Sequence, residues 1–300
     1  QTPVVSFMLA DILRDPELPE GYLHVLGGEG PTVGEWLLED ERIDLYSFTG
    51  SVPVGRRIKE RTGLPGYEIF TQPGDNGEGV TWNFQVNLWQ AGGEFLNPDN
   101  TKAAFNSPAG KRALQFWVDL VTRHGAPLGP WGAFEKGQAA SAQEGSWMVG
   151  IWATDAPIEF GTAALPVPEG GTQATNMGGE QAMVFSTASA TQQQAAIDFL
   201  MWFDSSDNVT TWSQATGMLP VVKSVAESDA YRTWVSANAP ALQPFIDLLP
   251  SAHARPNTPV YARVSFAFAK QVEQALNGQK TVDQALADAE AEVNQILAEA

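Results

Sequence analysis

A polar stretch rich in proline and glycine, residues 71–77, divides this 300-residue chain into two segments with different patterns. Before it, short apolar runs alternate with short helical stretches. After it, longer amphipathic helices predominate. A chain of this length has room for two domains of ordinary size, and 43% hydrophobic residues are enough for a substantial core. The sequence therefore predicts two parts, residues 1–71 and 72–300.

Composition excludes several classes of function. The formal net charge is -18, which disfavours nucleic acids and anionic membrane surfaces as partners but is compatible with neutral ligands. Solubility is the commoner explanation of such an acidic balance. The chain has no cysteine, so disulfides, thiolate metal sites and thiol nucleophiles are excluded. Its three histidines are not paired at i, i+4, and we expect no metal site.

The chain shows no sign of a membrane span or a signal peptide. It lacks a run of 18 apolar residues. Its first residues, Gln1-Thr2-Pro3, are not followed by the basic and apolar stretches of a leader. We expect either a removed leader or a cut end. Ten tryptophans are present, and most of them are expected in the core.

The first segment has the alternation of a βα layer. Helices are predicted from residue 2 to about residue 13, over 33–38 and over 54–61, and strands over 22–26 and 43–48. The second strand runs into Phe48-Thr49-Gly50-Ser51. Backbone N–H groups and a hydroxyl in such a turn can approach a phosphate. An ordinary helix N-cap is the alternative interpretation.

The order of motifs in this segment resembles the aldehyde dehydrogenase family. The motifs are Leu18-Pro19-Glu20-Gly21, Gly28-Glu29-Gly30, Val33-Gly34-Glu35, the 48–51 loop and Val54-Gly55-Arg56-Arg57-Ile58. The resemblance implies half of a Rossmann-like NAD(P) domain, in which Gly50 and Ser51 would approach the cofactor pyrophosphate. It also implies a catalytic cysteine, which this chain lacks, a Lys-Pro strand before Gln1, and a Glu-Leu-Gly-Gly stretch where Pro65-Gly66-Tyr67-Glu68 stands. We therefore expect no cofactor and no dehydrogenase activity.

Capping signals predict helices in the second segment. Ser107-Pro108 begins a helix that Gly125 ends. Capping boxes are predicted at Thr191 with Gln194 and at Thr281 with Gln284. Short strands are predicted over 148–152, 160–165 and 182–186. The mixture indicates an α/β fold in which helices predominate.

A second succession of motifs resembles the extracellular solute-binding proteins of ABC importers, the maltose-binding-protein-like family. The motifs are Gly77-Glu78-Gly79-Val80-Thr81-Trp82, 88–96, 105–108, 133–137, Glu144-Gly145-Ser146-Trp147, 160–166, Asn176-Met177-Gly178-Gly179-Glu180, 216–220 and 278–286. The resemblance implies periplasmic-binding-protein-like lobes around a cleft, preceded here by the Rossmann-like βα fragment. It implies non-enzymatic capture of a neutral sugar or oligosaccharide for ABC importer membrane subunits, in the periplasm or outside the cell.

The same resemblance implies ligand-binding residues of three kinds, aromatic, charged and glycine: Glu78, Trp82, Trp147, Gly178, Gly179, Arg255 and Tyr261. Trp147 would stack on a sugar ring, and the two glycines would let backbone N–H groups approach hydroxyls. The other four would line the cleft. Each type also has a structural interpretation, as a core tryptophan, a glycine turn, a solvated acid or a surface arginine.

Several functions remain open at this point. In the family, an opening β-α-β portion of the first lobe brings further groups to the cleft, and the dehydrogenase-like segment stands in its place here. Each ~1.4 kcal/mol of lost contact weakens binding tenfold, so we expect impaired sugar binding. The alternatives are an inactive NAD(P)-dependent dehydrogenase remnant and a fusion without an evolved function. For a glycosidase, the sequence fixes no carboxylate pair.

Overall fold

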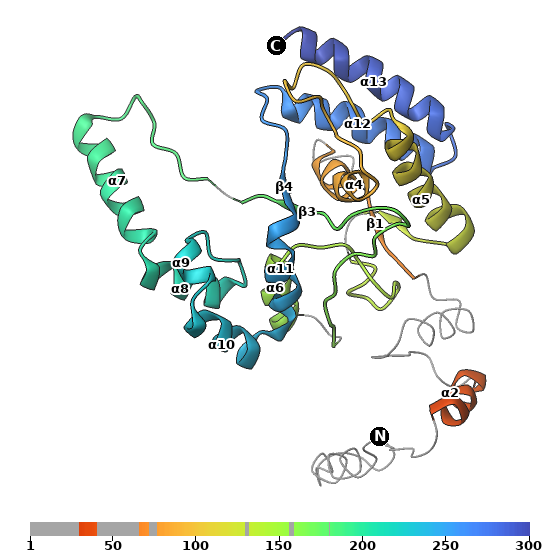
Figure 1. Cartoon of the computed structure of the whole chain (residues 1–300), viewed down its shortest axis with the longest axis horizontal. Helices are drawn as coiled ribbons and strands as arrows, with labels where there is room; N and C mark the ends of the chain where they lie inside the picture. Colours follow the sequence, from red (N-terminus) through yellow and green to blue (C-terminus); the bar gives the residue numbers. More distant parts are fainter. Residues whose placement is uncertain (1–29, 41–65, 72–76, 130–131, 156–158, 180) are drawn as a thin grey trace. The chain divides into compact units, whose positions relative to one another are not determined.

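The computed structural model describes residues 30–40, 66–71, 77–129, 132–155, 159–179 and 181–300 (Figure 1). The chain divides into two compact units, Gln1–Leu64 and Pro65–Ala300. In the first unit the helix α2 (Gly30–Glu39) is described, which confirms the helix predicted over 33–38. The other elements predicted for that segment, together with Gly50 and Ser51, lie outside the described residues.

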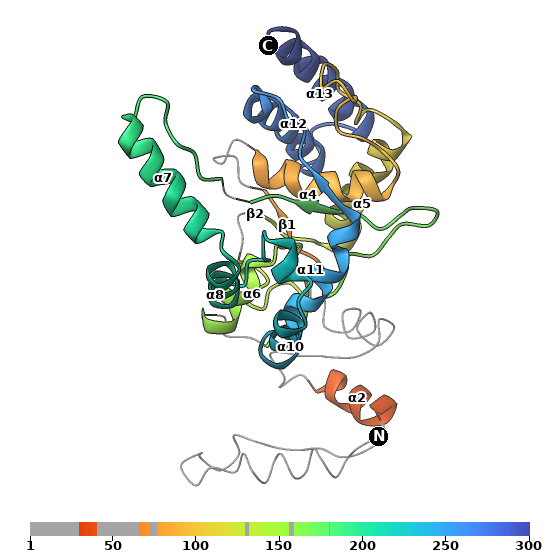
Figure 2. The same cartoon turned by 60° about the vertical axis from the view of Figure 1, so that its left-hand side comes forward.

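Four helices and a short strand pair enclose the larger core of the second unit. The helices are α4 (Glu78–Gln90), α5 (Pro108–His124), α12 (Tyr261–Leu276) and α13 (Val282–Ala298). The strands β1 (Ile69–Phe70) and β2 (Leu128–Gly129) pair in parallel. Figures 1 and 2 both show α12 and α13 side by side, next to α4 and α5.

Phe268 of α12 lies at the centre of this core. Its ring centroid is 4.9 Å from that of Phe84, 5.1 Å from that of Phe95 and 4.7 Å from that of Phe105. All four rings are buried. Tilted and edge-on ring pairs of this kind add to the stabilisation that burial alone provides. The aromatic cluster therefore joins α12 to α4 and to the loop between α4 and α5.

The helix ends follow the capping signals in two of the three predicted cases. The Ser107 hydroxyl accepts from the Gly110 amide at 3.2 Å, and α5 ends at Gly125 with φ 63°. Thr281 and Gln284 form the predicted capping box of α13. Both predictions are confirmed, because each signal depends on residues within one turn of the chain.

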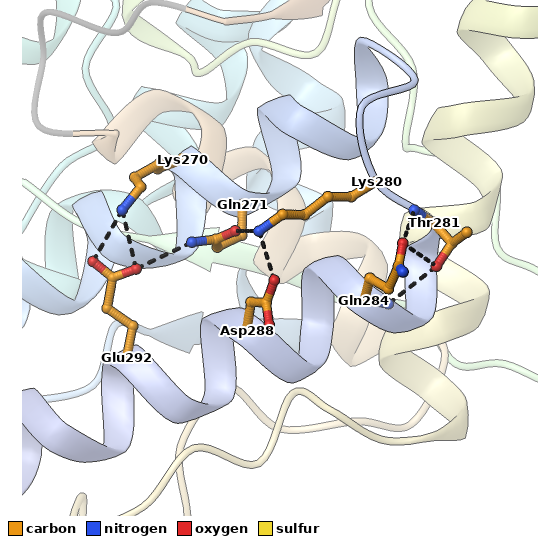
Figure 3. Close-up of polar contacts among 7 residues, drawn as sticks. All are labelled: Lys270, Gln271, Lys280, Thr281, Gln284, Asp288 and Glu292. Atoms are coloured by element: carbon orange, nitrogen blue, oxygen red, sulfur yellow. Dashed lines mark hydrogen bonds and ion pairs between the residues drawn. The ribbon is translucent and has the colours of Figure 1, made fainter.

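Polar side chains also join α12, α13 and the turn between them (Figure 3). The Lys280 ammonium donates to Gln271 Oε1 at 2.5 Å and to Asp288 Oδ2 at 2.6 Å. Gln271 Nε2 and the Lys270 ammonium both donate to Glu292, at 3.1 Å and 3.3 Å. Exposed pairs of this type contribute little individually, so burial of the aromatic and aliphatic side chains carries most of the stability of this helix pair.

A smaller core lies among the helices of residues 147–248. It contains Val149, Val209, Val225, Tyr231, Val235 and Leu242. They come from α6 (Trp147–Asp155), α8 (Ser206–Thr216), α9 (Lys223–Ala226), α10 (Asp229–Asn238) and η1 (Pro240–Leu242). Helices α7 (Ala190–Phe203) and α11 (Gln243–Leu248), with η2 (Leu249–Ser251), complete this part.

A second parallel strand pair leads from this part of the unit to α4. Strand β3 (Thr175–Met177) pairs with β4 (Ala252–Ala254), in the register Thr175 to Ala252. Contacts between β3 and α4 fix the pair beside the larger core. None of the helices in the described ranges is long and apolar enough to cross a membrane.

Three strand predictions were wrong. Residues 148–152 form part of α6. The prediction failed because an uninterrupted apolar run has no period that distinguishes a buried helix from a buried strand. Residues 160–165 and 182–186 do not form a strand, since a strand requires a partner and none is paired with them among the described residues.

Two further predictions were wrong. The capping box of α7 is Ser189 with Gln192, two residues before the predicted pair, because Ser189 matches the same pattern and comes first. Most tryptophans are not in the core. Of the nine that the structure describes, Trp89 and Trp117 are buried, and Trp36, Trp202 and Trp212 are exposed.

Gly77 provides a test of the contact between α4 and α12. It has φ 74°, and a Cβ there would lie 2.4 Å from Ala269 Cβ, whereas a Cβ at Gly92, with φ 83°, would meet nothing within 4 Å. We predict that Gly92→Ala lowers the free energy of unfolding by about 1–2 kcal/mol through its left-handed backbone. Gly77→Ala should lower the free energy of unfolding by roughly 1–3 kcal/mol more than Gly92→Ala does, because α4 and α12 must move apart to make room for the new methyl group.

Urea unfolding followed by far-UV circular dichroism compares the two variants. Equal losses would show that α12 moves away from Gly77 without a measurable penalty, and would contradict the prediction.

Candidate ligand-binding site

The candidate site is built on facing sides of α4 and α12. Glu78, Trp82 and Gln85 are spaced i, i+4 and i+7 on α4, and Tyr261 and Ser265 are spaced i, i+4 on α12. Residues at these spacings lie on one face of a helix. Because the two helices pack together, the two rows of side chains meet.

Arg255, just after β4, is the central residue of the site. Its Nη1 donates to Glu78 Oε1 at 2.5 Å. Its guanidinium carbon lies 4.9 Å from the centroid of the Trp82 ring and 5.8 Å from that of the Tyr261 ring. A guanidinium at these distances is attracted to the ring faces. The side chains of Arg255 and Glu78 are 37% and 32% exposed, so solvent and ligands can reach them.

Hydrogen bonds hold the partners of Arg255 in place. Glu78 Oε2 accepts from the Ser265 hydroxyl at 3.1 Å, and the Tyr261 oxygen accepts from Gln85 Nε2 at 3.0 Å. Burial, with a further contribution from the Glu78 carboxylate, raises the pKa of Tyr261 well above its usual range, although Gln85 and Arg255 act in the opposite direction. Tyr261 is therefore a neutral phenol at physiological pH.

Gly178 lies directly against the aromatic ring of Trp82. A Cβ at residue 178 would come within 2.6 Å of Trp82 Cη2 and 3.5 Å of Arg255 Nη2, whereas one at Gly179 would meet nothing within 4 Å. The Asn176 amide donates to the Trp82 carbonyl and fixes the end of β3 on α4. Only glycine leaves the backbone this close to the ring, and the space beside Gly179 is open.

Trp147 is not joined to this cluster by the contacts of the described residues. It begins α6, and its ring folds over Gly145, where a Cβ would lie 2.1 Å from Trp147 Cη2. Four residues earlier, Gln143 Nε2 donates to the Asn83 carbonyl at 3.1 Å. The segment that leads to Trp147 therefore passes α4 one residue from Trp82, but a role for Trp147 stays a prediction.

The structure thus brings together five of the predicted residues: Glu78, Trp82, Gly178, Arg255 and Tyr261. Three residues that hold them were not predicted from the sequence: Gln85, Asn176 and Ser265. Their helical spacing from Trp82 and Tyr261 is a usable signal for the first and the last. Asn176 belongs to the motif at 176–180, but its hydrogen bond to the Trp82 carbonyl depends on the packing of β3.

The site presents an aromatic face beside a balanced pair of charges. This combination suits binding by stacking and hydrogen bonds. No group of three or more histidine, aspartate or glutamate side chains in the described ranges is placed to hold a metal ion. A hollow of about 320 Å³ between α12 and α13, lined in part by Arg263, Phe266 and Glu292, shares no residue with the site.

Comparison with known families places this chain. The model of the bacterial extracellular solute-binding protein family matches residues 49–241, which is more than half of the 300 residues. The chain belongs to the bacterial extracellular solute-binding protein family. The fold is the helix-rich α/β fold expected for this family.

Solved structures of the same kind are similar to the chain. The cyclic alpha-maltosyl-1,6-maltose binding protein from Arthrobacter globiformis is 57% identical, with a TM-score of 0.75, over 83% of this chain and 63% of that one. Maltose-bound T. maritima MalE3 is 25% identical, with a TM-score of 0.68, over 81% and 63%. An ABC transporter solute-binding protein from Thermotoga lettingae, bound with alpha-D-tagatose, is 25% identical, with a TM-score of 0.66, over 79% and 61%.

The beginning of the chain matches a different family. The aldehyde dehydrogenase model matches residues 1–69. A 3-sulfolactaldehyde dehydrogenase from Priestia aryabhattai is 43% identical over 63 residues, 21% of this chain and 13% of that protein. A 1-pyrroline-5-carboxylate dehydrogenase from Geobacillus thermodenitrificans is 47% identical over 60 residues, which are 20% of this chain and 12% of that protein. The chain therefore spans a small part of these dehydrogenases and less than two thirds of the sugar-binding structures.

Tyr261 gives this site a pH-dependent signature. Burial is the main cause that raises the pKa of Tyr67, Tyr231 and Tyr261. A group whose pKa is raised on folding contributes stability that is complete below the unfolded pKa, about 10 for tyrosine, and that is lost as pH rises toward the folded pKa. We predict that the urea concentration at the unfolding midpoint decreases as the pH is raised from about 9 to about 11. In Tyr261→Phe this decrease should be smaller.

The measurement is a set of urea titrations at fixed ionic strength, with the phenolate absorbance of the folded protein recorded in parallel. Identical alkaline losses in the two proteins would show that Tyr261 titrates normally in the folded state.

Proposed function

We propose that the second unit binds a neutral sugar or oligosaccharide without chemical conversion. The observation that carries this proposal is the Trp82 ring, with Arg255, which is paired with Glu78, over it and the side-chain-free Gly178 against it. An aromatic face can stack on the apolar face of a sugar ring, and the charged pair can hydrogen-bond with hydroxyls. Membership of the solute-binding family supports it.

The charges of the site favour a neutral ligand over a charged one. The Glu78 carboxylate and the Arg255 guanidinium pair at 2.5 Å, so their charges cancel locally. A carboxylate or ammonium ligand would have to replace one partner and leave the other unpaired, which is unfavourable in a partly buried site. A hydroxyl can donate to the carboxylate and accept from the guanidinium without breaking the balance.

We assign Trp147 and Gly179 to the same ligand, as contacts made from its other side. Trp147 offers a second aromatic surface, and the open space beside Gly179 leaves its backbone accessible. The proteins of similar structure include ones that bind cyclic alpha-maltosyl-1,6-maltose, maltose and alpha-D-tagatose. We propose the same class of ligand here, delivered to ABC importer membrane subunits, in the periplasm or outside the cell.

We propose no catalytic role for the dehydrogenase-like beginning of the chain. The chemistry of that family requires a cysteine, and the chain contains none. We place the change of ancestry between Leu64, where the first unit ends, and residue 72. Residues 1–71 are then a fragment fused to a solute-binding region that spans 72–300, and Gly50 and Ser51 are a vestige of a cofactor loop.

The proposal is tested by calorimetric titration of the 300-residue protein with cyclic alpha-maltosyl-1,6-maltose, maltose and tagatose. We predict saturable binding of at least one sugar. Loss of a stacking aromatic ring removes roughly 1–3 kcal/mol of contact, so Trp82→Ala should weaken binding by about ten- to a hundredfold. Arg255→Met should also weaken it, because hydroxyls lose their donor.

Trp36→Ala is the matched control, since Trp36 is an exposed tryptophan of the first unit, and this variant should bind normally. Circular dichroism confirms that each variant is folded. If the folded protein binds none of the sugars, the proposal is wrong and the chain is a fusion without an evolved function. Saturable binding of NAD instead would favour the interpretation as a dehydrogenase remnant.

A further inference from the structure

Apolar side chains are exposed in an unusual concentration over residues 183–212. Of the seventeen large hydrophobic side chains that are exposed in the described part of the chain, eight fall in these thirty positions: Met183, Val184, Phe185, Ile197, Phe199, Met201, Trp202 and Trp212. Single exposed hydrophobic residues need no explanation, but a contiguous group marks an interaction surface.

Helix α7 carries the larger share of this group. It has no buried residue, and Phe199, Met201 and Trp202 are 56%, 72% and 60% exposed. Phe199 and Trp202 are three positions apart and share one face, where their ring centroids lie 5.7 Å apart, whereas Met201 points to another side, because successive residues are separated by about 100°. A helix that is apolar on more than one side is normally covered on more than one side. Among the described residues, α7 meets α8, where the ring centroids of Phe203 and Trp212 lie 5.4 Å apart, and the apolar side chains on its other sides are left exposed.

The residues before α7 carry the sequence pattern of a strand but have no partner strand. Met183 and Phe185 are 79% and 78% exposed, and residues 182–186 pair with no described strand. A short uninterrupted apolar run such as Met183-Val184-Phe185 is consistent with a strand that is covered on both faces of a sheet. The order strand, turn, helix over 182–203 is that of a βα unit, in which the helix covers the sheet that the strand joins.

This βα segment is already shaped for docking. The Ser189 and Gln192 capping box fixes the start of α7, so little chain order has to be gained on binding. Asp198 is the one charged residue in 181–203, in a chain where 17% of residues are charged. An uncharged apolar surface is suited to a permanent, dry interface rather than to a transient one.

We propose that residues 182–203 are a docking surface for an α/β polypeptide that offers an open strand edge to 182–186 and an apolar sheet face to α7. The occupant is the part of a solute-binding protein that has no counterpart in these 300 residues. That part exists, because the chain covers 63% of the Arthrobacter globiformis protein and 61–63% of the two Thermotoga structures. Strand addition would supply the missing backbone hydrogen bonds.

A second copy of this chain is the less suitable occupant. Each copy carries a formal net charge of -18, so association of two copies is opposed by their mutual repulsion. Two 182–186 segments could pair with each other, but the described residues of the two copies provide no further sheet on which both α7 helices could pack. The proposal does not depend on which ligand the site binds.

The test is co-expression of the tagged 300-residue chain with the portion of the Arthrobacter globiformis protein that this chain does not cover. We expect a one-to-one complex on tag purification and light scattering, with new amide protection over 182–186 in hydrogen exchange. As a control, the same portion is co-expressed with the rest of the Arthrobacter globiformis protein. The amount of complex recovered from this natural pair is the reference for the test.

Substitutions locate the interface. Phe185→Glu and Trp202→Glu should reduce recovery of the complex at least tenfold, because each would bury a charge, and both side chains are exposed, so the free chain still folds. Val221→Glu is the control, since Val221 is 81% exposed and lies outside the segment, and it should have no effect.

Recovery of the chain without the added portion would overturn the proposal. A complex in which 182–203 gains no protection, or a complex of two copies of the chain through this segment, would overturn it as well. Sugar titrations are carried out separately on the free chain and on the complex. Docking without sugar binding would refute the proposed function and leave the docking surface standing.

Discussion

The packing of α4 on α12 holds both the larger core and the candidate site. Gly77 lets the two helices approach, with Ala269 on the other side, and Phe84 and Phe268 meet between them at 4.9 Å. Buried aromatic and aliphatic surface is the main source of stability in such a core. The same approach aligns the polar row of α4 with that of α12, so a change that separates the helices also separates Glu78 from Ser265.

The site follows from that alignment because its central residue comes from elsewhere in the chain. Arg255 arrives on the segment after β4, whose pairing with β3 sets its position beside Trp82. The guanidinium therefore rests on an aromatic ring and against a carboxylate at once. Such an arrangement fixes a donor, an acceptor and a stacking face without a net charge, and this combination is what a polyhydroxylated neutral ligand requires.

The two ancestries of the chain explain the uneven burial of the second unit. The helices of the larger core bury their apolar faces on one another, whereas α7 leaves its apolar residues exposed. A βα segment can bury its apolar side chains only on a sheet. The structural relatives are longer than the region that this chain shares with them. The exposed segment therefore marks the place where the shared region meets something further.

The sequence alone determined the features that depend on neighbouring residues. The caps at Ser107 and Thr281 and the family order of motifs were all visible in it, and so was the absence of cysteine, the residue to which the aldehyde dehydrogenase resemblance assigns catalysis. The tertiary structure decided the helix at 148–152 and the unpaired state of 182–186, because an apolar run has no diagnostic period and a strand depends on a distant partner. It also decided which candidate residues meet. Arg255 and Glu78 are 177 positions apart, and only the packing of α4, α12 and β4 brings them together.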